Sequence, residues 1–405
     1  MESFNLNKLR EYIPQELPQL PQMPRLPSWA RHTSMNPDEE EEEAIASASA
    51  SASATTGTQS DVPSRLSEEP PLDLTEPQPI PAGPKSNLDL INECDNFPYY
   101  QDNPKLFFAH INTYYGLYVK DFPETELGYM LPSVVEVFRG LPDWKVDKKE
   151  RSITLMTGST AEERSKIVAS TCQAMRKTGH FKVLNGWRDE LYAVYGLKGE
   201  LLFSIERAAS ALFGIVTYGC HMTAYTKGDA SESDEKSGQN LKIWVPRRAA
   251  TKQTYGRMLD NTVAGGIASG ESPFESIVRE SAEEASLPAD LVRKHAKAVG
   301  AVTYFHIRDQ RAGGETKLLQ PECQYVYDLD LPEGVVPKPS DDEVEGFELM
   351  SVDEVKQALR DGEFKPNCAM VLLDFFVRHG VLTAEDEGYI EIGARLHRKL
   401  EFPTV

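Results

Sequence analysis

The stretch that decides the fold runs from Gly265 to Leu287 and reads GGIASGESPFESIVRESAEEASL. Ser272, followed by Pro273 and by a glutamate at position 275, forms a capping-box start for a helix with proline at its first position. We expect this helix to end at about Ala285, because Leu287 is followed by a proline, which disfavours helical backbone. The stretch therefore predicts a glycine loop, a capped helix and a turn.

Three carboxylates share one stripe of this expected helix. Glu280, Glu283 and Glu284 are related by steps of three and four residues, which place side chains on the same helical face. Carboxylates this close repel one another unless a cation compensates them, and Mg²⁺ or Mn²⁺ takes oxygen ligands of this kind. The alternative is a solvated acidic helix with no ligand.

The other positions of the helix complete its expected orientation. Arg279 lies four residues after Glu275 and four before Glu283, so it can brace and orient a carboxylate. The apolar side is expected to lie opposite the glutamates and to face a core. It consists of Phe274, Val278, Ala282 and Ala285.

The spacing of this stretch resembles the Nudix box, G-x5-E-x7-R-E-U-x-E-E-x-G-U, in which U is aliphatic. Gly265, Glu271 and the Arg279–Glu284 segment match without a gap, whereas Ser281 replaces an aliphatic residue and Ser286 replaces a glycine. Neither departure removes a carboxylate. A serine at the helix end costs about 1 kcal/mol or less in a left-handed backbone, and the Ser281 hydroxyl can bond back to the helix. The resemblance implies a Nudix mixed α/β/α sandwich and Mg²⁺-assisted hydrolysis of a diphosphate.

Segments outside the box resemble one branch of this superfamily, which carries an extra N-terminal domain and is often labelled thiamine pyrophosphokinase-related. This resemblance covers about residues 85–405 and implies hydrolysis of thiamine diphosphate, particularly its oxidised or damaged forms, to the monophosphate plus phosphate. Kinase activity is not implied, because no G-x-x-x-x-G-K-[ST] loop is present. The matching segments are Phe181–Tyr192, Glu206–Ala209, Leu259–Gly266, Tyr325–Leu329, Glu343–Phe347, Phe364–Ala369 and Leu396–Pro403.

Two other functions remain open from the sequence. One keeps the reaction and changes the substrate to an oxidised nucleoside diphosphate such as 8-oxo-deoxyguanosine diphosphate. The other is a non-catalytic, Nudix-like ligand sensor, with the acidic N-terminal tail recruiting partners. The intact carboxylates of the box count against the sensor.

The resemblance assigns roles to individual residues. The metal ligands are Glu280, Glu283 and Glu284. Glu271 supports the site by organising water or pairing with Arg279. The box does not fix the general base, for which Glu284 and Glu345 are the candidates. Further substrate-binding candidates are Gly265, Gly266, His221, Arg247 and Asn261, with Tyr218, Asp260 and Glu322 as weaker ones. Structural readings remain for His221, as a satisfied buried histidine, and for Arg247, as a surface arginine.

The chain divides into four expected parts. Residues 1–84 form a Pro-, Glu- and Ser-rich tail that buries too little apolar surface to order itself, apart from a short docking motif around Leu17, Leu20, Leu26 and Trp29. A small α+β domain (85–210), the Nudix domain (211–372) and a C-terminal segment packed on the ordered core (373–405) follow. The expected elements are helices at Ser159–Lys177, Leu202–Leu212 and Val352–Leu359, and strands at Tyr192–Tyr195, Phe213–Thr226, Leu241–Val245, Val299–Ile307 and Gln324–Asp330.

Composition restricts the partners and the location. Half of the net charge of −20 lies in residues 38–78, which hold eleven acidic residues and one basic residue, and no clustered basic patch points to nucleic acid. No apolar run reaches the roughly 18 residues of a membrane span, and no secretory signal is visible. The five scattered cysteines indicate reduced thiols. We expect a cytoplasmic protein with a small-molecule diphosphate substrate, leaving organellar targeting and oligomeric state open.

Overall fold

The computed structural model of the protein describes residues 9, 11–13, 83–228, 240–252, 254–340 and 342–405. Its largest sheet contains β7 (Thr217–Lys227), β8 (Leu241–Arg248), β9 (Val263–Gly266), β10 (Ala296–Ile307), β11 (Leu319–Asp330) and β12 (Val344–Ser351). The strand order is β10-β11-β7-β8-β12, and β9 pairs with β7 beside this path.

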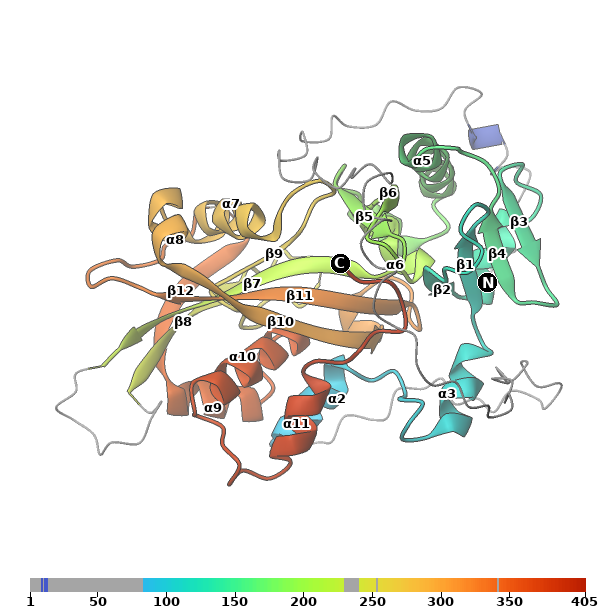
Figure 1. Cartoon of the computed structure of the whole chain (residues 1–405). Coiled ribbons are helices and arrows are strands. Elements are labelled where there is room, and N and C mark those ends of the chain that lie inside the picture. The colour runs from blue at the N-terminus through green and yellow to red at the C-terminus, as the bar shows by residue number, and fades with distance from the viewer. Residues whose placement is uncertain (1–8, 10, 14–82, 229–239, 253, 341) are drawn as a thin grey trace, which may run out of the picture.

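Helices cover both faces of this sheet (Figure 1). One face carries α7 (Pro273–Ala285) and α8 (Ala289–His295). The other carries α2 (Asn87–Cys94), α9 (Val352–Arg360), α10 (Pro366–Arg378) and α11 (Tyr389–Arg395). This arrangement confirms the expected α/β/α sandwich.

The pairing of β7 places the glycine loop. Strand β7 runs parallel to β11 and antiparallel to β9, with Gly219 opposite Gly266 and Cys220 opposite Gly265. It also forms the expected hairpin with β8, through Tyr225↔Ile243. The polar connection at residues 229–239 lies outside the described residues. The box glycines therefore lie directly beside a buried central strand.

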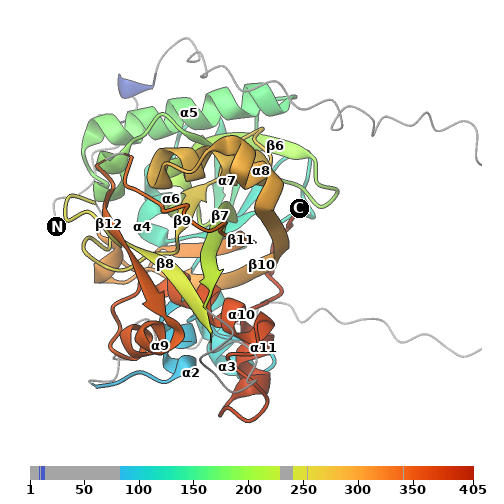
Figure 2. The same ribbon diagram turned by 90° about the vertical axis from the view of Figure 1, so that its left-hand side faces the viewer.

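The N-terminal part of the chain forms a separate four-stranded sheet and a hairpin. The sheet has the order β2-β1-β4-β3, made of β1 (Tyr115–Val119), β2 (Gly128–Met130), β3 (Trp144–Asp147) and β4 (Ser152–Leu155). The hairpin joins β5 (Leu191–Tyr195) and β6 (Leu201–Glu206). Helices α3 (Pro104–Ile111), α4 (Pro132–Val135) and α5 (Ala161–Thr178) accompany them, and α5 crosses above β6 in Figure 2.

The helix expected at Leu202–Leu212 is wrong in its first half. Residues Leu201–Glu206 form β6, and helical backbone begins only with a 3-10 turn, η4 (Arg207–Ala209), and α6 (Ser210–Phe213). Leu202, Phe203 and Ile205 are all buried, because both faces of this strand are covered. A short continuous apolar run does not distinguish a doubly covered strand from a helix. The strand expected from Phe213 starts later, at Thr217, because Phe213 is the last residue of helix α6.

Two expected boundaries need revision. Leu9 is fully buried in the hydrophobic cluster of the N-terminal sheet, and Tyr12 and Ile13 pack against it, so the tail is not unstructured throughout. The motif around Leu17, Leu20, Leu26 and Trp29 lies outside the described residues. At the other end, α10 spans the boundary expected at residue 372, so the Nudix domain and the C-terminal segment share a helix.

The structure also bears on the cysteines and on possible membrane-spanning helices. All five cysteines are free, and all five are buried. Among the described residues, no helix is both long and apolar enough to cross a membrane.

Candidate active site

Helix α7 has the boundaries expected from its sequence. The Ser272 hydroxyl accepts a hydrogen bond from the backbone N–H of Glu275 at 3.3 Å, and Pro273 takes the first helical position. At the other end, Ser286 adopts a left-handed backbone with φ of 52°, and the N–H of Leu287 donates to the carbonyl of Ser281 at 3.0 Å. Serine thus fulfils the conformational role of the usual glycine at this helix end.

The buried face of α7 differs from the expected one. Ile277, Ser281 and Ala285 are fully buried, whereas Ala282 is exposed. The Ser281 hydroxyl donates to the carbonyl of Ile277 at 2.6 Å, which satisfies its hydrogen bond inside the core as predicted. On the helix this buried face lies directly beside positions 280 and 284, so those glutamates border the core instead of lying opposite it.

Arg279 ties together three carboxylates of the box. Its Nε and Nη2 donate to the two carboxylate oxygens of Glu271 at 2.9 and 3.0 Å. Its Nη1 donates to Glu280 and to Glu283, each at 2.9 Å. Bidentate and charge-assisted bonds of this kind fix orientation as well as charge. Glu275 does not take part, because it pairs with Arg293 at 2.7 Å.

Glu280 and Glu284 are the more enclosed carboxylates. The Glu280 side chain is 13% exposed and that of Glu283 is 54% exposed. Glu284 accepts a hydrogen bond from the N–H of Ala264 at 3.0 Å. Burial, followed by the charges of Glu280 and Asp260, raises the pKa of Glu284 above its usual range, and burial also raises that of Glu280. The surroundings of the pair therefore disfavour two negative charges in the absence of a compensating cation.

This donor set fits a hard divalent cation. In the part of the chain that the structure describes, no three His, Cys, Asp or Glu side chains are grouped as a metal site. The available donors are nevertheless all oxygens. A Cβ on Gly265 would lie 2.1 Å from Cδ of Glu280, so the backbone of β9 approaches this carboxylate closely. Two crowded, buried carboxylates beside a bare backbone suit Mg²⁺ or Mn²⁺.

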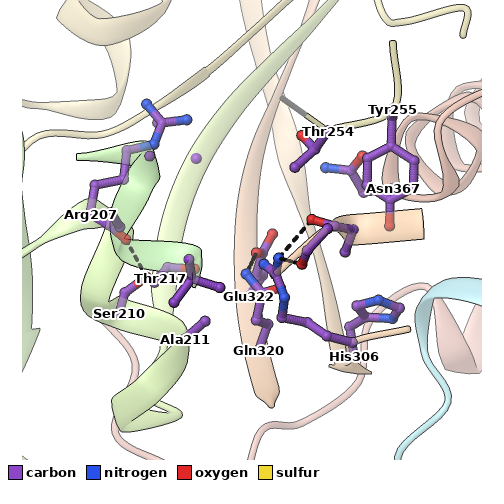
Figure 3. A pocket seen from close by; sticks show the side chains of 18 of the residues that line it. Arg207, Ser210, Ala211, Thr217, Thr254, Tyr255, His306, Gln320, Glu322 and Asn367 are labelled. Carbon is purple, nitrogen blue, oxygen red and sulfur yellow. Dashed lines mark hydrogen bonds between the residues drawn. The ribbon is translucent and has the colours of Figure 1, made fainter. Parts of the chain in front are cut away.

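Gly265 and Gly266 border a cavity of about 580 Å³ between the N-terminal hairpin and the large sheet, and the described lining does not include the box carboxylates. Figure 3 shows Arg207 and Ser210 on one side, and Tyr255, His306 and Asn367 on the other. Among the charged side chains that line the cavity, Glu322 is the one acid. The bases that line it are Lys182, Arg188, Arg207, Arg308 and Lys365. Although the whole chain is strongly acidic, this cavity presents an excess of positive charge.

The structure places the predicted substrate residues in different surroundings. Gly265, Gly266 and His221 line the cavity. Asn261 lies behind His221, with its Oδ1 2.7 Å from the histidine Nδ1. Burial lowers the pKa of His221 to about 4, so the imidazole is neutral at physiological pH.

Two other candidates lie away from the cavity lining. Arg247 donates to the carbonyl of Arg257 at 3.0 Å and lies 3.6 Å from Glu363. Glu345 is exposed on β12 and accepts a bond from the N–H of Ala250 at 3.1 Å. Of the weaker candidates, Glu322 and Tyr218 line the cavity, whereas Asp260 is paired with Arg248.

Several lining residues were missed by the sequence-based assignment. Gln324 is 5% exposed, and its Oε1 has no hydrogen-bond partner among the described residues. Its Nε2 donates to Glu322 at 2.7 Å. Tyr192 lies on β5 of the N-terminal hairpin, and Arg188 and Arg207 lie just before and just after the hairpin. These three residues could have been proposed from the sequence, because they lie in segments 181–192 and 206–209, which resemble the same branch of the superfamily.

Comparison with known proteins agrees with this geometry. A profile described as the NUDIX domain matches residues 233–368, and a domain of unknown function (DUF4743) matches residues 110–217. The uncharacterized protein YJR142W of Saccharomyces cerevisiae is 35% identical over 333 residues, which cover 79% of this chain and 93% of that protein. The chain belongs to the Nudix hydrolase superfamily. It is thus an enzyme of the diphosphate-hydrolase class, with an additional N-terminal domain.

Other similar proteins cover shorter segments. Nudix hydrolase 20, chloroplastic, of Arabidopsis thaliana is 38% identical over 240 residues, and the match covers 59% of each chain. Among solved structures, DR0079 from Deinococcus radiodurans is 19% identical and covers 46% of this chain and 100% of its own, with a TM-score of 0.34.

Proposed function

We propose that this Nudix enzyme hydrolyses thiamine diphosphate, particularly its oxidised or damaged forms, to the monophosphate and phosphate. The observation that supports a diphosphate substrate is the position of the box glycines in the wall of a cavity lined by five basic residues and one acid. Several cationic groups around one cavity attract and orient phosphate oxygens. The thiamine moiety rests on the resemblance of the segments outside the box, and Glu322 and Gln324 offer polar groups for an amino-bearing ring.

The proposed cofactor is Mg²⁺ or Mn²⁺, held by Glu280, Glu283 and Glu284. When bound, it would supply neutralisation of phosphate oxygens and a lowered pKa for an attacking water. Arg279 positions two of these ligands through Nη1 and is itself oriented by Glu271. The protein therefore contributes the enclosed Glu280 carboxylate and the exposed Glu283 carboxylate, both held by Arg279.

Of the two candidate bases, Glu284 fits the site better. It accepts a hydrogen bond from the N–H of Ala264, which lines the cavity. Glu345 is exposed and bonded to the backbone of Ala250. We therefore assign the proton-accepting role to Glu284.

The experiment that tests the function is phosphate release by the full-length chain in Mg²⁺, with intact and oxidised thiamine diphosphate and 8-oxo-deoxyguanosine diphosphate as substrates. We expect the highest kcat/KM for oxidised thiamine diphosphate and loss of turnover in Glu284→Gln. A preference for the nucleoside diphosphate would support the second substrate class. Equal inertness of wild type and variant on every compound would refute the hydrolase.

The cellular location is part of the same proposal. We expect the protein in the cytoplasm, although the names of two plant relatives include "chloroplastic". Fluorescence imaging of the tagged full-length chain distinguishes the two locations.

A further inference from the structure

We infer that the N-terminal domain completes the active site, with Arg188 binding a phosphate of the substrate in the cavity that Gly265 and Gly266 also line. This inference rests on the proposed diphosphate chemistry, but it concerns residues outside the Nudix box. It assigns to the additional domain a direct role in substrate binding.

The first supporting observation is that the N-terminal hairpin is bonded to the glycine loop of the box. The N–H of Ser269 donates to the carbonyl of Leu191 on β5 at 2.7 Å. The hydroxyls of Ser269 and Ser204, on β6, are 2.8 Å apart and buried. The hairpin therefore has a fixed position relative to the loop, and side chains at its ends are held in register with the box.

Tyr192 of the N-terminal hairpin also packs directly against Gly266 of the box. A Cβ on Gly266 would lie 2.0 Å from the Tyr192 hydroxyl oxygen, so this tyrosine occupies the space that any side chain at position 266 would need. Tyr192 is only 7% exposed. The contact is therefore part of the packed interior and cannot be a loose surface encounter.

Arg207 shows that charge acts across the cavity. It forms an ion pair with Glu190 at 2.8 Å and lies 5.4 Å from the centroid of the Tyr192 ring. Although burial opposes the shift, Tyr192, Glu190 and, more weakly, Glu280 raise the pKa of Arg207. Arg207 is thus a held, positioning charge whose field reaches the carboxylates of the box.

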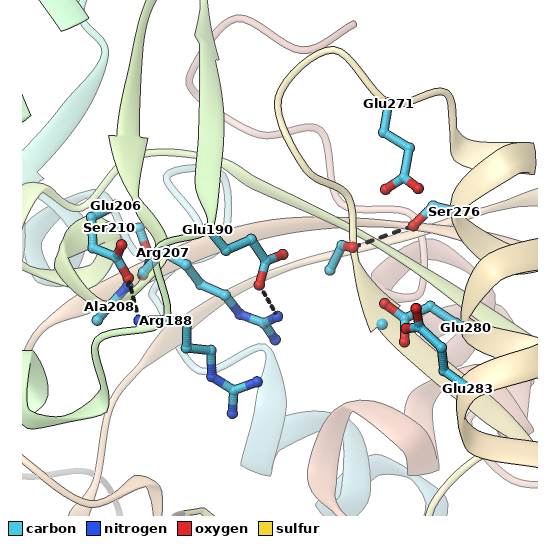
Figure 4. A network of polar contacts seen from close by, with 12 residues as sticks. Arg188, Glu190, Glu206, Arg207, Ala208, Ser210, Glu271, Ser276, Glu280 and Glu283 are labelled. Atoms are coloured by element: carbon cyan, nitrogen blue, oxygen red, sulfur yellow. Dashed lines mark hydrogen bonds and ion pairs between the residues drawn. The ribbon is translucent and has the colours of Figure 1, made fainter. Parts of the chain in front are cut away.

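Arg188 differs from Arg207 because its guanidinium forms no ion pair with any described residue, although its backbone N–H is fixed by Glu206 at 3.0 Å. In Figure 4, the Arg207 side chain extends toward the helix that carries Glu280 and Glu283, and the Arg188 guanidinium lies below that of Arg207. Arg188 is exposed and lines the cavity together with Gly265 and Gly266. An anchored backbone with a free, planar pair of donors suits bidentate binding of phosphate.

The test measures binding, so that it does not depend on turnover. Methylenediphosphonate, which contains no hydrolysable P–O–P bond, is titrated calorimetrically into the full-length chain in Mg²⁺. We expect Arg188→Met to raise its Kd about 10- to 100-fold, as for loss of a charge-assisted hydrogen bond, and Arg188→Lys to recover part of the affinity. The matched control is Arg139→Met, because Arg139 pairs with Glu136 in the same domain and does not line the cavity.

Each outcome separates this inference from the proposed function. Equal affinity in wild type and Arg188→Met, or no binding of the probe to wild type, would overturn the role of Arg188 whatever the hydrolysis assay gives. A weakened variant supports it even if no tested compound is hydrolysed. The nearby charge of Glu343, whose pKa Arg188 helps to lower, offers Arg188 a purely structural role. In that case Arg188→Met would change the melting temperature and leave probe affinity unchanged.

Discussion

Gly265 and Gly266 are neighbours on strand β9, yet they face two different parts of the molecule. A Cβ on Gly265 would meet the carboxylate of Glu280, and a Cβ on Gly266 would meet the hydroxyl of Tyr192. Successive positions of a strand point to opposite faces, so one glycine faces the box helix and the other faces the N-terminal hairpin. Neither has a positive φ, so both are needed for space. The Gly265–Gly266 dipeptide thus contacts the carboxylates of the box on one face and the packed N-terminal hairpin on the other.

The largest expected effect is a loss of kcat on substitution of Glu284, a carboxylate of the box helix. Glu284→Gln keeps the shape of the side chain and removes its charge and proton-accepting ability, so we expect kcat to fall about 10²- to 10⁴-fold. Steady-state phosphate release measures this loss. Glu348→Gln, on exposed surface of β12, is the control and is expected to leave kcat unchanged.

The second prediction concerns the Gly265 face. Gly265→Ala would displace the Glu280 carboxylate, whose Cδ lies 2.1 Å from the added carbon. We expect metal affinity to fall about 10- to 100-fold, as for other losses of ligand support, with a small change in stability, since a side-chain end can move. Titration with Mn²⁺, followed by electron paramagnetic resonance, measures the affinity. Unchanged Mn²⁺ affinity would show that Glu280 is not a ligand of the metal.

The third prediction concerns the Gly266 face. Gly266→Ala forces apart the packed hairpin and strand, so we expect a loss of about 1–3 kcal/mol in the free energy of unfolding, typical of overpacking. Combining it with Tyr192→Phe removes the closest atom and should recover part of the loss. Urea denaturation measures both. If Gly266→Ala instead weakened Mn²⁺ binding more than Gly265→Ala, the comparison between the two faces would be reversed.

The fourth prediction uses the raised pKa of Glu284. A carboxyl whose folded-state pKa lies above its unfolded value contributes stability at low pH and loses it as pH rises through the folded value. In metal-free protein we expect the free energy of unfolding to fall by up to about 4 kcal/mol between about pH 5 and about pH 8. Thermal melts in EDTA check this slope. Glu284→Gln should flatten it, and Mg²⁺ should raise the melting temperature most at the higher pH.

The smallest effect is expected at the second candidate base. Glu345 is exposed and bonded only to a backbone N–H among the described residues, so Glu345→Gln should change kcat by no more than about twofold, as for an ordinary surface substitution. A loss comparable to that of Glu284→Gln would transfer the proton-accepting role to Glu345.

Local sequence predicted those parts of the molecule that local interactions build. The cap at Ser272, the left-handed end at Ser286 and the internal bond of Ser281 each join residues at most a few positions apart, and all three were predicted. Leu202 and Ala282 were misassigned because their environments depend on what packs against them. Leu202 is covered on a strand, and Ala282 is left exposed beside a buried Ser281.

The cavity could not be predicted in this way, because residues far apart in the sequence form its walls. Arg188 and Arg207 meet Gly265 and Gly266 across a domain boundary, and no periodicity within either segment shows that meeting. Their placement depends on the bonds from Ser269 to Leu191 and Ser204. A basic cavity within a strongly acidic chain is likewise invisible to net charge.

By itself, the sequence determined the capped box helix, the ordered spacing of its carboxylates and the superfamily to which the chain belongs. Helix caps and side-chain pairs of this kind form over three or four residues, so the linear order is enough to specify them. The tertiary structure decided which glutamates are enclosed, that Arg279 holds three carboxylates, and that the N-terminal hairpin forms the opposite wall. Burial and long-range packing set these features, because they arise only when segments far apart in the chain exclude water together.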